Sequence, residues 1–153
     1  MIEISNIIFF DGMCNFCNST VDFFYSKNHP KTIFYASLQS EFAKSFLPKE
    51  YLQKEGFDTI YYYSNGIFYS KSTAVLKALK ETKGIYKLLS IFIIVPSIIR
   101  DTVYNFISKR RHKIFGRSDT CRLPSEEEKK YFLEKELDLT KYKLHWNAVY
   151  TNR

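Results

Sequence analysis

The sequence predicts an α/β fold: a four-stranded mixed sheet flanked by helices, with a helical C-terminal extension. Three observations lead to this prediction. An apolar run at 6–10 is followed by a stretch with helical periodicity and then by a second β-rich run at 32–36. Further along, two aromatic runs flank Asn65-Gly66, a dipeptide suited to a tight hairpin turn. The last third of the chain has the longer periodicity of helices.

The first of these segments reads as strand, helix, strand. The run "NIIFF" at 6–10 is continuously apolar, which is typical of a strand buried on both faces. Apolar residues then recur on one helical face from Phe16 to Phe24, and Pro30 ends the helix. The β-rich run "TIFYA" at 32–36 completes a βαβ unit, whose two strands are parallel.

The middle of the chain adds two strands and two helical stretches. Residues 38–55 predict one helix interrupted at a proline. The runs at 59–63 and 67–70 predict an antiparallel hairpin. A helix should follow, with Ser72 as its N-cap and Gly84 at its C-terminal end.

The chain divides into three parts in this interpretation. Residues 1–84 form the α/β core, residues 85–139 form a helical extension packed on the same domain, and residues 140–153 form an irregular tail. Within the extension, helices are expected over 85–95, 97–112 and 125–137.

Composition restricts the class of protein. A chain of 153 residues with 45% hydrophobic content is long enough for one domain with a real core. The longest apolar stretch, 88–99, is too short for a membrane-spanning helix, which needs about 20 residues. The N-terminus lacks the basic region and cleavage site of a signal peptide. We therefore expect a cytoplasmic protein in a reducing environment.

Positive charge gathers in the segment 100–122. It has seven basic residues against Asp101 and Asp119, within a chain of net charge +7. One interpretation is a solvated helix face. The other is a peripheral membrane or partner-docking module, in which the basic segment makes weak contact with an anionic surface and the apolar stretch 88–99 takes part. No nucleic-acid-binding module matches the segment, so no nucleic-acid partner is expected.

Two cysteines, Cys14 and Cys17, follow the first strand directly. A Cys-x-x-Cys pair at the first strand-to-helix junction, in the element order β-α-β-α-β-β-α, is the arrangement of the thioredoxin-like fold. The N-terminus of a helix favours an anion and lowers the pKa of a thiol placed there. We expect an exposed Cys14 that attacks and a shielded Cys17 that resolves, because Cys17 belongs to the apolar stripe of the helix.

Other interpretations of the cysteines stay open. Cys14, Cys17 and Cys121 could hold a soft metal such as Cu(I) or Zn, although a structural zinc site usually needs four ligands. The two cysteines could also be small core residues. A cysteine hydrolase would need a histidine as base, and no pattern in the sequence places one there. The histidines available to either site are His29, His112 and His145.

The sequence also resembles a known family. "FFDGMCNFC" is similar to the Asp-x-x-Cys-x-x-Cys signature of the DCC-type thiol-disulfide oxidoreductases, which are small thioredoxin-like proteins. The resemblance extends through "YASLQS" and "SNGIFYSKSTAVLKAL" to the basic stretch "YNFISKRRHKIFGRSDTCRLP", and it covers about residues 5–125. It implies a redox-active disulfide, no cofactor, and a disulfide-containing protein or small thiol as substrate. The reducing partner is not implied.

Carried over residue by residue, the resemblance places Asp11, Cys14 and Cys17 at the catalytic site. Asp11 either orients the strand-to-helix turn or acts on the thiols, as a proton acceptor or by raising the pKa of Cys14. Cys121 is expected to be dispensable.

The expected substrate-binding residues are Gly12, Met13, Asp58 and Thr59. Thioredoxins have a cis-proline where this chain has Asp58-Thr59. An acidic side chain there would oppose the thiolate, which favours a narrow or non-protein thiol substrate.

Overall fold

Five strands form the central sheet, in the order β3-β2-β4-β5-β7. The structure, a computed structural model, describes residues 2–28, 32–53, 59–120, 123–135, 142–144 and 149–150. The strands are β2 (Asn6–Phe10), β3 (Ile33–Ser37), β4 (Tyr61–Ser64), β5 (Ile67–Ser70) and β7 (Val149–Tyr150). β2 pairs parallel with β3 and antiparallel with β4, and β4 pairs antiparallel with β5. The four predicted strands correspond to β2–β5 and form the mixed sheet of the thioredoxin-like fold, which confirms the prediction, and β7 adds a fifth strand at one edge.

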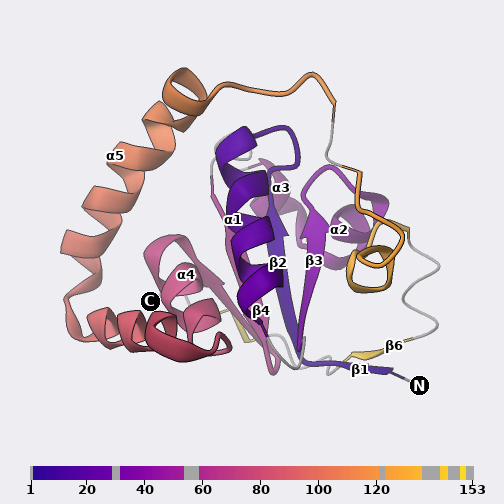
Figure 1. The fold of residues 1–153 in the computed structure, drawn as a ribbon, viewed down its shortest axis with the longest axis horizontal. Coiled ribbons are helices and arrows are strands. Elements are labelled where there is room, and N and C mark those ends of the chain that lie inside the picture. The colour runs from indigo at the N-terminus through magenta and orange to yellow at the C-terminus, as the bar shows by residue number, and fades with distance from the viewer. Residues whose placement is uncertain are drawn as a thin grey trace.

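Helices cover both faces of the sheet (Figure 1). α1 (Asn15–Lys27) and α4 (Lys71–Leu79) lie on one face, and α2 (Glu41–Phe46) and α3 (Lys49–Gln53) lie on the other. β2 is buried along its whole length because its side chains alternate between the two layers. Ile7 and Phe9 pack toward α2, while Ile8 and Phe10 pack toward α1.

The hairpin between β4 and β5 turns where the sequence predicted it. Asn65 and Gly66 have φ angles of 49° and 88°, the positive values that a two-residue primed turn requires. The strand begins at Tyr61 rather than at Thr59. The predicted N-cap at Ser72 is wrong, because α4 begins at Lys71 and the hydroxyl of Ser72 donates to Asp101 instead.

The C-terminal part contributes helices and strands beyond the core. The 3-10 helix η1 (Gly84–Ile94) leads into the long helix α5 (Ser97–Phe115). The tail, expected to be irregular, contains β7 and also β6 (Tyr142–Leu144), which pairs parallel with β1 (Ile2–Ile4). Within the described residues, no helix has both the length and the apolar character needed to cross a bilayer.

The helix expected over 125–137 is wrong for the described residues of that stretch. Only a short 3-10 turn forms, η2 (Lys129–Tyr131). The chain then extends, and the N–H of Leu133 donates to the carbonyl of Tyr35 in β3 (2.8 Å). Phe132 and Leu133 are buried there against the sheet. Pairing with the edge of β3 and burial of these two side chains replace the helical hydrogen bonds.

Candidate active site

Cys14 occupies the N-cap position of α1, directly after the turn that leaves β2. Its Sγ accepts a hydrogen bond from the backbone N–H of Cys17 (3.3 Å). The first N–H groups of a helix have no partner within the helix, so a sulfur at this position satisfies one of them. The positive end of the helix dipole lies at the same place, which stabilises a thiolate.

The two thiols differ strongly in acidity. The Cys17 thiol donates a hydrogen bond to the Cys14 sulfur. This bond, the Cys17 N–H and the electrostatic effect of Arg111 and His112 lower the pKa of Cys14 to about 6, against the opposing effect of burial. The same hydrogen bond and burial raise the pKa of Cys17 above its ordinary value. Near neutral pH, Cys14 is therefore the thiolate and Cys17 the thiol.

Asp11 lies at the end of β2, and its carboxylate contacts both sides of the site. Oδ1 accepts from the backbone N–H of Met13 (3.0 Å) and from Nε2 of Gln39 (2.7 Å), which fixes the strand-to-helix turn. Oδ2 lies 3.6 Å from Nη2 of Arg111 and 3.8 Å from Nε2 of His112. Asp11 is only 3% exposed, so these contacts form in a largely dry environment.

The face of α5 that is turned toward the site begins with Tyr104. The hydroxyl of Tyr104 accepts from the backbone N–H of Ile60 (3.0 Å), just before β4. Burial raises the pKa of Tyr104 to about 12, so it stays a neutral phenol. Ser108 and Arg111 follow at intervals of four and three residues, and both are buried.

The segment from Phe115 to Ser118, here called the strap, lies across the start of α1 and covers Cys14. Asn15 Nδ2 donates to the carbonyl of Phe115 (3.1 Å), and the N–H of Ser118 donates to the carbonyl of Met13 (2.8 Å). Cys14 and Arg117 form an antiparallel β-bridge. The chain leaves α5 at Gly116, within the strap. Its φ of 78° lies in the region that favours glycine.

Cys14 is completely buried as a result, with an exposed fraction of 0%, whereas Cys17 is 9% exposed. The expectation of an exposed Cys14 was wrong. The physical reason is the strap, which adds a second layer over the start of α1. The sequence pattern around the cysteines contains no sign of a contact from about 100 residues further along the chain.

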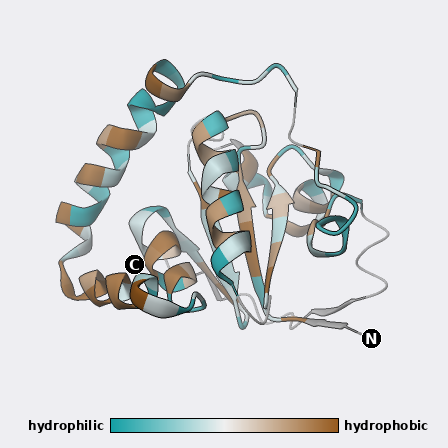
Figure 2. Cartoon of the chain, in the orientation of Figure 1, coloured by the Kyte–Doolittle hydropathy of each residue, from teal (hydrophilic) through white to brown (hydrophobic). Residues whose placement is uncertain are grey.

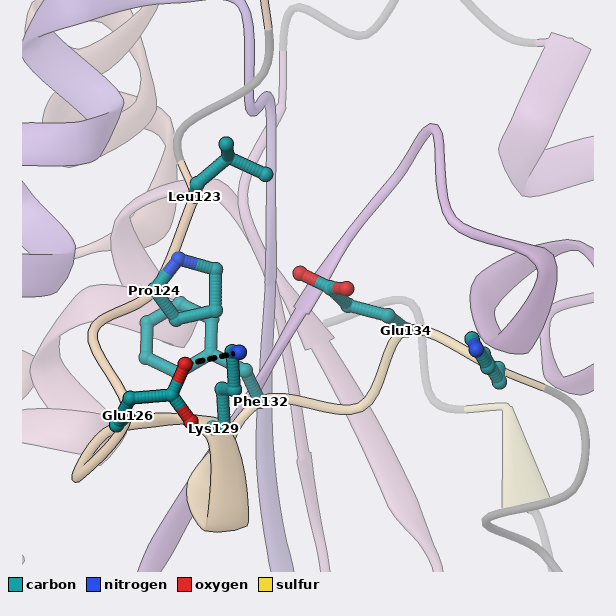
Figure 3. Close-up of a pocket in the computed structure, with 7 residues that line it drawn as sticks. Leu123, Pro124, Glu126, Lys129, Phe132 and Glu134 are labelled. Atoms are coloured by element: carbon teal, nitrogen blue, oxygen red, sulfur yellow. Dashed lines mark hydrogen bonds and ion pairs between the residues drawn. The ribbon is translucent and has the colours of Figure 1, made fainter.

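A small cavity of about 50 Å³ lies beside Cys17, between the start of α1 and α5. Its lining includes Cys17, Asp11, Thr59, Tyr104 and Arg111. The second cavity, of about 450 Å³, lies over the stretch 123–135 (Figure 3). Its described lining contains an ion pair between Lys129 and Glu126 but neither cysteine nor histidine. Of the two cavities, the small one adjoins Cys17 and the larger one lies away from the cysteines.

A family model described as DCC1-like thiol-disulfide oxidoreductase matches residues 8–117, which include the cysteines, α5 and most of the strap. The chain belongs to the DCC1-like thiol-disulfide oxidoreductase family. This confirms the resemblance seen in the sequence.

Two relatives agree with this membership. The uncharacterized protein YuxK of Bacillus subtilis (strain 168) is 40% identical over 129 residues, which cover 84% of this chain and 94% of that protein. A chloroplastic DCC family protein of Arabidopsis thaliana is 34% identical over 118 residues, covering 76% of this chain and 69% of that protein. No solved structure gives a significant match.

The structure places the three signature residues Asp11, Cys14 and Cys17 close together at the start of α1, and their catalytic roles stay predictions. The expected substrate-binding residues Gly12 and Met13 lie in the same turn, but their backbone groups already have partners. Gly12 donates to Oε1 of Gln39 (3.0 Å), and the carbonyl of Met13 accepts from the strap.

Of the other expected residues, one lines the small cavity and the rest lie outside the described residues. Thr59 is buried and lines the small cavity. Asp58 and Cys121 lie outside the described residues, as do His29 and His145 of the alternative metal site. Their roles stay predictions.

Two residues of α5, Arg111 and His112, complete the site. The sequence reasoning missed Arg111, and it named His112 only as a histidine available to a metal or hydrolase site, without placing it beside the cysteines. Arg111 and His112 belong to the basic segment 100–122, which was interpreted as a solvated face or as a surface for anions. Arg111 is instead 3% exposed. The helical periodicity could have indicated the burial of Arg111. Tyr104, Ser108 and Arg111 lie on one face of the helix, at intervals of four and three residues.

The position of His112 bears on the two alternative interpretations, a metal site and a cysteine hydrolase. One ligand atom each from Asp11, Cys14 and His112 lie within 4.8 Å of one another. Three such groups could hold a metal ion, and a thiolate close to an imidazole is also a nucleophile–base arrangement. The guanidinium of Arg111 beside Asp11 opposes a second positive charge in this cluster.

Proposed function

We propose that this protein catalyses thiol-disulfide exchange, with Cys14 as the attacking thiolate and Cys17 as the resolving thiol. One observation carries the proposal. Cys14 accepts hydrogen bonds from Cys17 at the start of α1, and the pKa values of the two thiols are shifted in opposite directions. In a dithiol couple of this kind, one sulfur is the attacking thiolate and the other is a protonated thiol that resolves the mixed disulfide.

In the first step, the Cys14 thiolate attacks one sulfur of a substrate disulfide. A bond forms between Cys14 Sγ and that sulfur, the substrate S–S bond breaks, and the released thiolate takes a proton from solvent. The product is a mixed disulfide on Cys14. A pKa of about 6 keeps the attacking sulfur ionised at neutral pH, so no base is needed for this step.

In the second step, the sulfur of Cys17 attacks Cys14 Sγ. The intramolecular disulfide forms, the bond to the substrate breaks, and the proton of Cys17 goes to the second released sulfur. Two electrons have then passed from the dithiol to the substrate. Loss of the Cys14 charge in the mixed disulfide removes the contact that raises the pKa of Cys17, which favours this step. A dithiol reductant would return the electrons by the same steps in reverse.

The substrate is a small or narrow disulfide in this proposal. The strap covers Cys14, and the N–H of Ile60 at the start of β4 is taken by Tyr104, so a bound peptide cannot pair there without displacing it. A small disulfide needs only a brief opening of the strap. A reducing compartment such as the cytoplasm would keep the resting protein in the dithiol form.

Trapping of the mixed disulfide tests the assignment. The Cys17→Ser protein, exposed to glutathione disulfide, should accumulate one glutathione on Cys14, because the internal resolving thiol is missing. Mass spectrometry after proteolysis locates the adduct. The matched Cys14→Ser protein should form no adduct at Cys17. An adduct confined to Cys17 in the native sequence would reverse the two roles.

Soft-metal binding is the second candidate, supported by the cluster of Asp11, Cys14 and His112. Metal analysis of the native protein, purified under reducing conditions, separates the candidates. One equivalent of Cu(I) or Zn that is lost in a His112→Gln variant, together with no glutathione adduct in the Cys17→Ser protein, would favour the metal site. A metal-free native protein that forms the adduct favours exchange.

A further inference from the structure

An apolar ridge runs along the outside of η1. Ile85, Leu88, Ile91 and Ile94 recur at every third residue, and a 3-10 helix has three residues per turn, so their side chains lie in one row. Each is more than half exposed, from 63% at Ile91 to 78% at Ile94. The whole of η1 is described, and none of its 11 residues is buried.

The exposed apolar surface continues along α5. Ile99, Val103, Phe106, Arg110 and Ile114 are separated by three or four residues, so they share one face of the helix. All five are exposed, whereas Ser108 and Arg111 on the face turned to the active site are buried. Figure 2 shows hydrophobic residues along η1 and repeatedly along α5. The ridge and this stripe are together called the apolar surface.

Side-chain contacts hold both elements in place. Tyr86 packs edge-on against Phe23 of α1, with ring centroids 4.9 Å apart. Arg100 donates to the carbonyl of Val95 (2.7 Å) and to the hydroxyl of Ser72 in α4 (2.9 Å). The apolar surface is therefore an outward face of a packed structure, and its exposure does not come from a detached segment.

Positive charge lies beside the apolar surface. Lys109, Arg110 and Lys113 are exposed near the C-terminal end of α5. The guanidinium of Arg110 stacks on Phe106, 3.9 Å from the ring centroid, so its stem lies along the apolar stripe. Between Gly84 and Phe115 the sequence has one acidic residue, Asp101, which accepts a hydrogen bond from Ser72.

We propose that the apolar surface binds a lipid bilayer that contains anionic lipids, with η1 and α5 lying in the headgroup region. Monomeric proteins rarely expose apolar patches larger than a few hundred Å² unless the patch binds something. An apolar face with adjacent lysine and arginine residues fits the boundary between acyl chains and anionic headgroups. The near absence of acidic residues makes this face complementary to such a surface. The proposal does not depend on the chemistry of the cysteines.

Vesicle flotation of the full chain tests the proposal. The protein should float with vesicles of phosphatidylcholine that contain 30% phosphatidylserine, and much less with phosphatidylcholine alone. Arg110→Gln with Lys113→Gln should weaken binding about thirtyfold, since each basic residue near an anionic surface contributes about fivefold in affinity. The matched control is Lys44→Gln with Lys49→Gln. It removes the same charge from exposed residues of α2 and α3, on the other face of the sheet, and should bind as the native protein does.

The ridge is tested by a second variant, Leu88→Glu with Ile91→Glu, which should no longer float. Both side chains are exposed, so the variant should keep the native circular dichroism spectrum. Three results would overturn the proposal: no binding to anionic vesicles, equal loss of binding in the Lys44/Lys49 control, or binding that does not weaken as salt rises. A native dimer that the ridge variant abolishes, without vesicle binding, would assign the surface to a second copy of the chain.

Discussion

The guanidinium of Arg111 lies 3.6 Å from the carboxylate of Asp11, and both side chains are almost completely buried. Asp11 follows β2 and fixes the turn that leads to Cys14, while Arg111 belongs to α5. The pair therefore ties the C-terminal helix to the catalytic turn. Arg111 also lowers the pKa of Cys14 through its charge, so a single side chain contributes to both stability and reactivity.

Replacement of Arg111 by methionine should destabilise the fold by about 3 kcal/mol, because a buried carboxylate loses its ion-pair partner. The variant should also raise the pKa of Cys14, since one of the nearby positive charges is lost. Urea unfolding measures the first effect, and the pH dependence of thiolate absorbance at 240 nm measures the second.

The double variant Asp11→Asn with Arg111→Met separates the ion pair from general packing. It should be more stable than Arg111→Met alone, because no unpaired charge is left in the interior. Equal free energies of unfolding for the single and double variants would show that the ion pair between Asp11 and Arg111 does not stabilise the fold.

Substitutions of Cys17 should change the acidity of Cys14 in a graded way. The hydrogen bond from the Cys17 side chain is the largest contribution to the lowered pKa of Cys14. Serine keeps a hydroxyl donor, whereas alanine removes it. The pKa of Cys14 should therefore stay near 6 in Cys17→Ser and rise in Cys17→Ala, as measured by the rate of alkylation of Cys14 against pH in a Cys121→Ala background. Identical pH profiles would assign the shift to the helix and the basic residues instead.

The stability of the reduced protein should rise with pH through the range in which Cys14 ionises. A thiol whose pKa is lowered on folding binds fewer protons in the folded state than in the unfolded state between pH 6 and its ordinary pKa. Its contribution is complete above the ordinary pKa of about 8.5 and is lost as pH falls through about 6. The difference in unfolding free energy between the native protein and Cys14→Ala, both reduced, should grow from pH 5.5 to pH 8.5. A constant difference would contradict the lowered pKa.

Local signals in the sequence predicted much of the core and the position of the cysteines. A continuous apolar run identified β2, Asn65-Gly66 identified the hairpin, and the change of periodicity after Cys14 identified α1. Each of these signals is contained within about a dozen neighbouring residues.

The rest depends on contacts between distant parts of the chain. The burial of Arg111, the strap over Cys14 and the extended course of Phe132 and Leu133 all arise from pairing with distant residues. The run of glutamate and lysine before Phe132 favours a helix by propensity, but pairing with β3 overrides it. The cluster "RRH" shows the same limit, because its charge alone does not reveal which arginine points inward.

Gly116 should control access to Cys14, and a second glycine provides the matched control. Gly116 has φ 78° and ψ 172°, a conformation almost restricted to glycine, and an added Cβ would lie 3.4 Å from Nδ2 of Asn15, which holds the strap. Gly116→Ala should therefore strain the strap by on the order of 1–3 kcal/mol and increase the population in which Cys14 is exposed. Alkylation of Cys14 at pH 7.5, followed by mass spectrometry, should become about tenfold faster.

Gly84→Ala is the matched control. It introduces similar strain at φ 75°, with no atom within 4 Å of the new Cβ and no contact with the strap, and should leave that rate unchanged. Equal acceleration in both variants would point to global unfolding as the route to Cys14, and no acceleration in Gly116→Ala would show that the strap does not limit access.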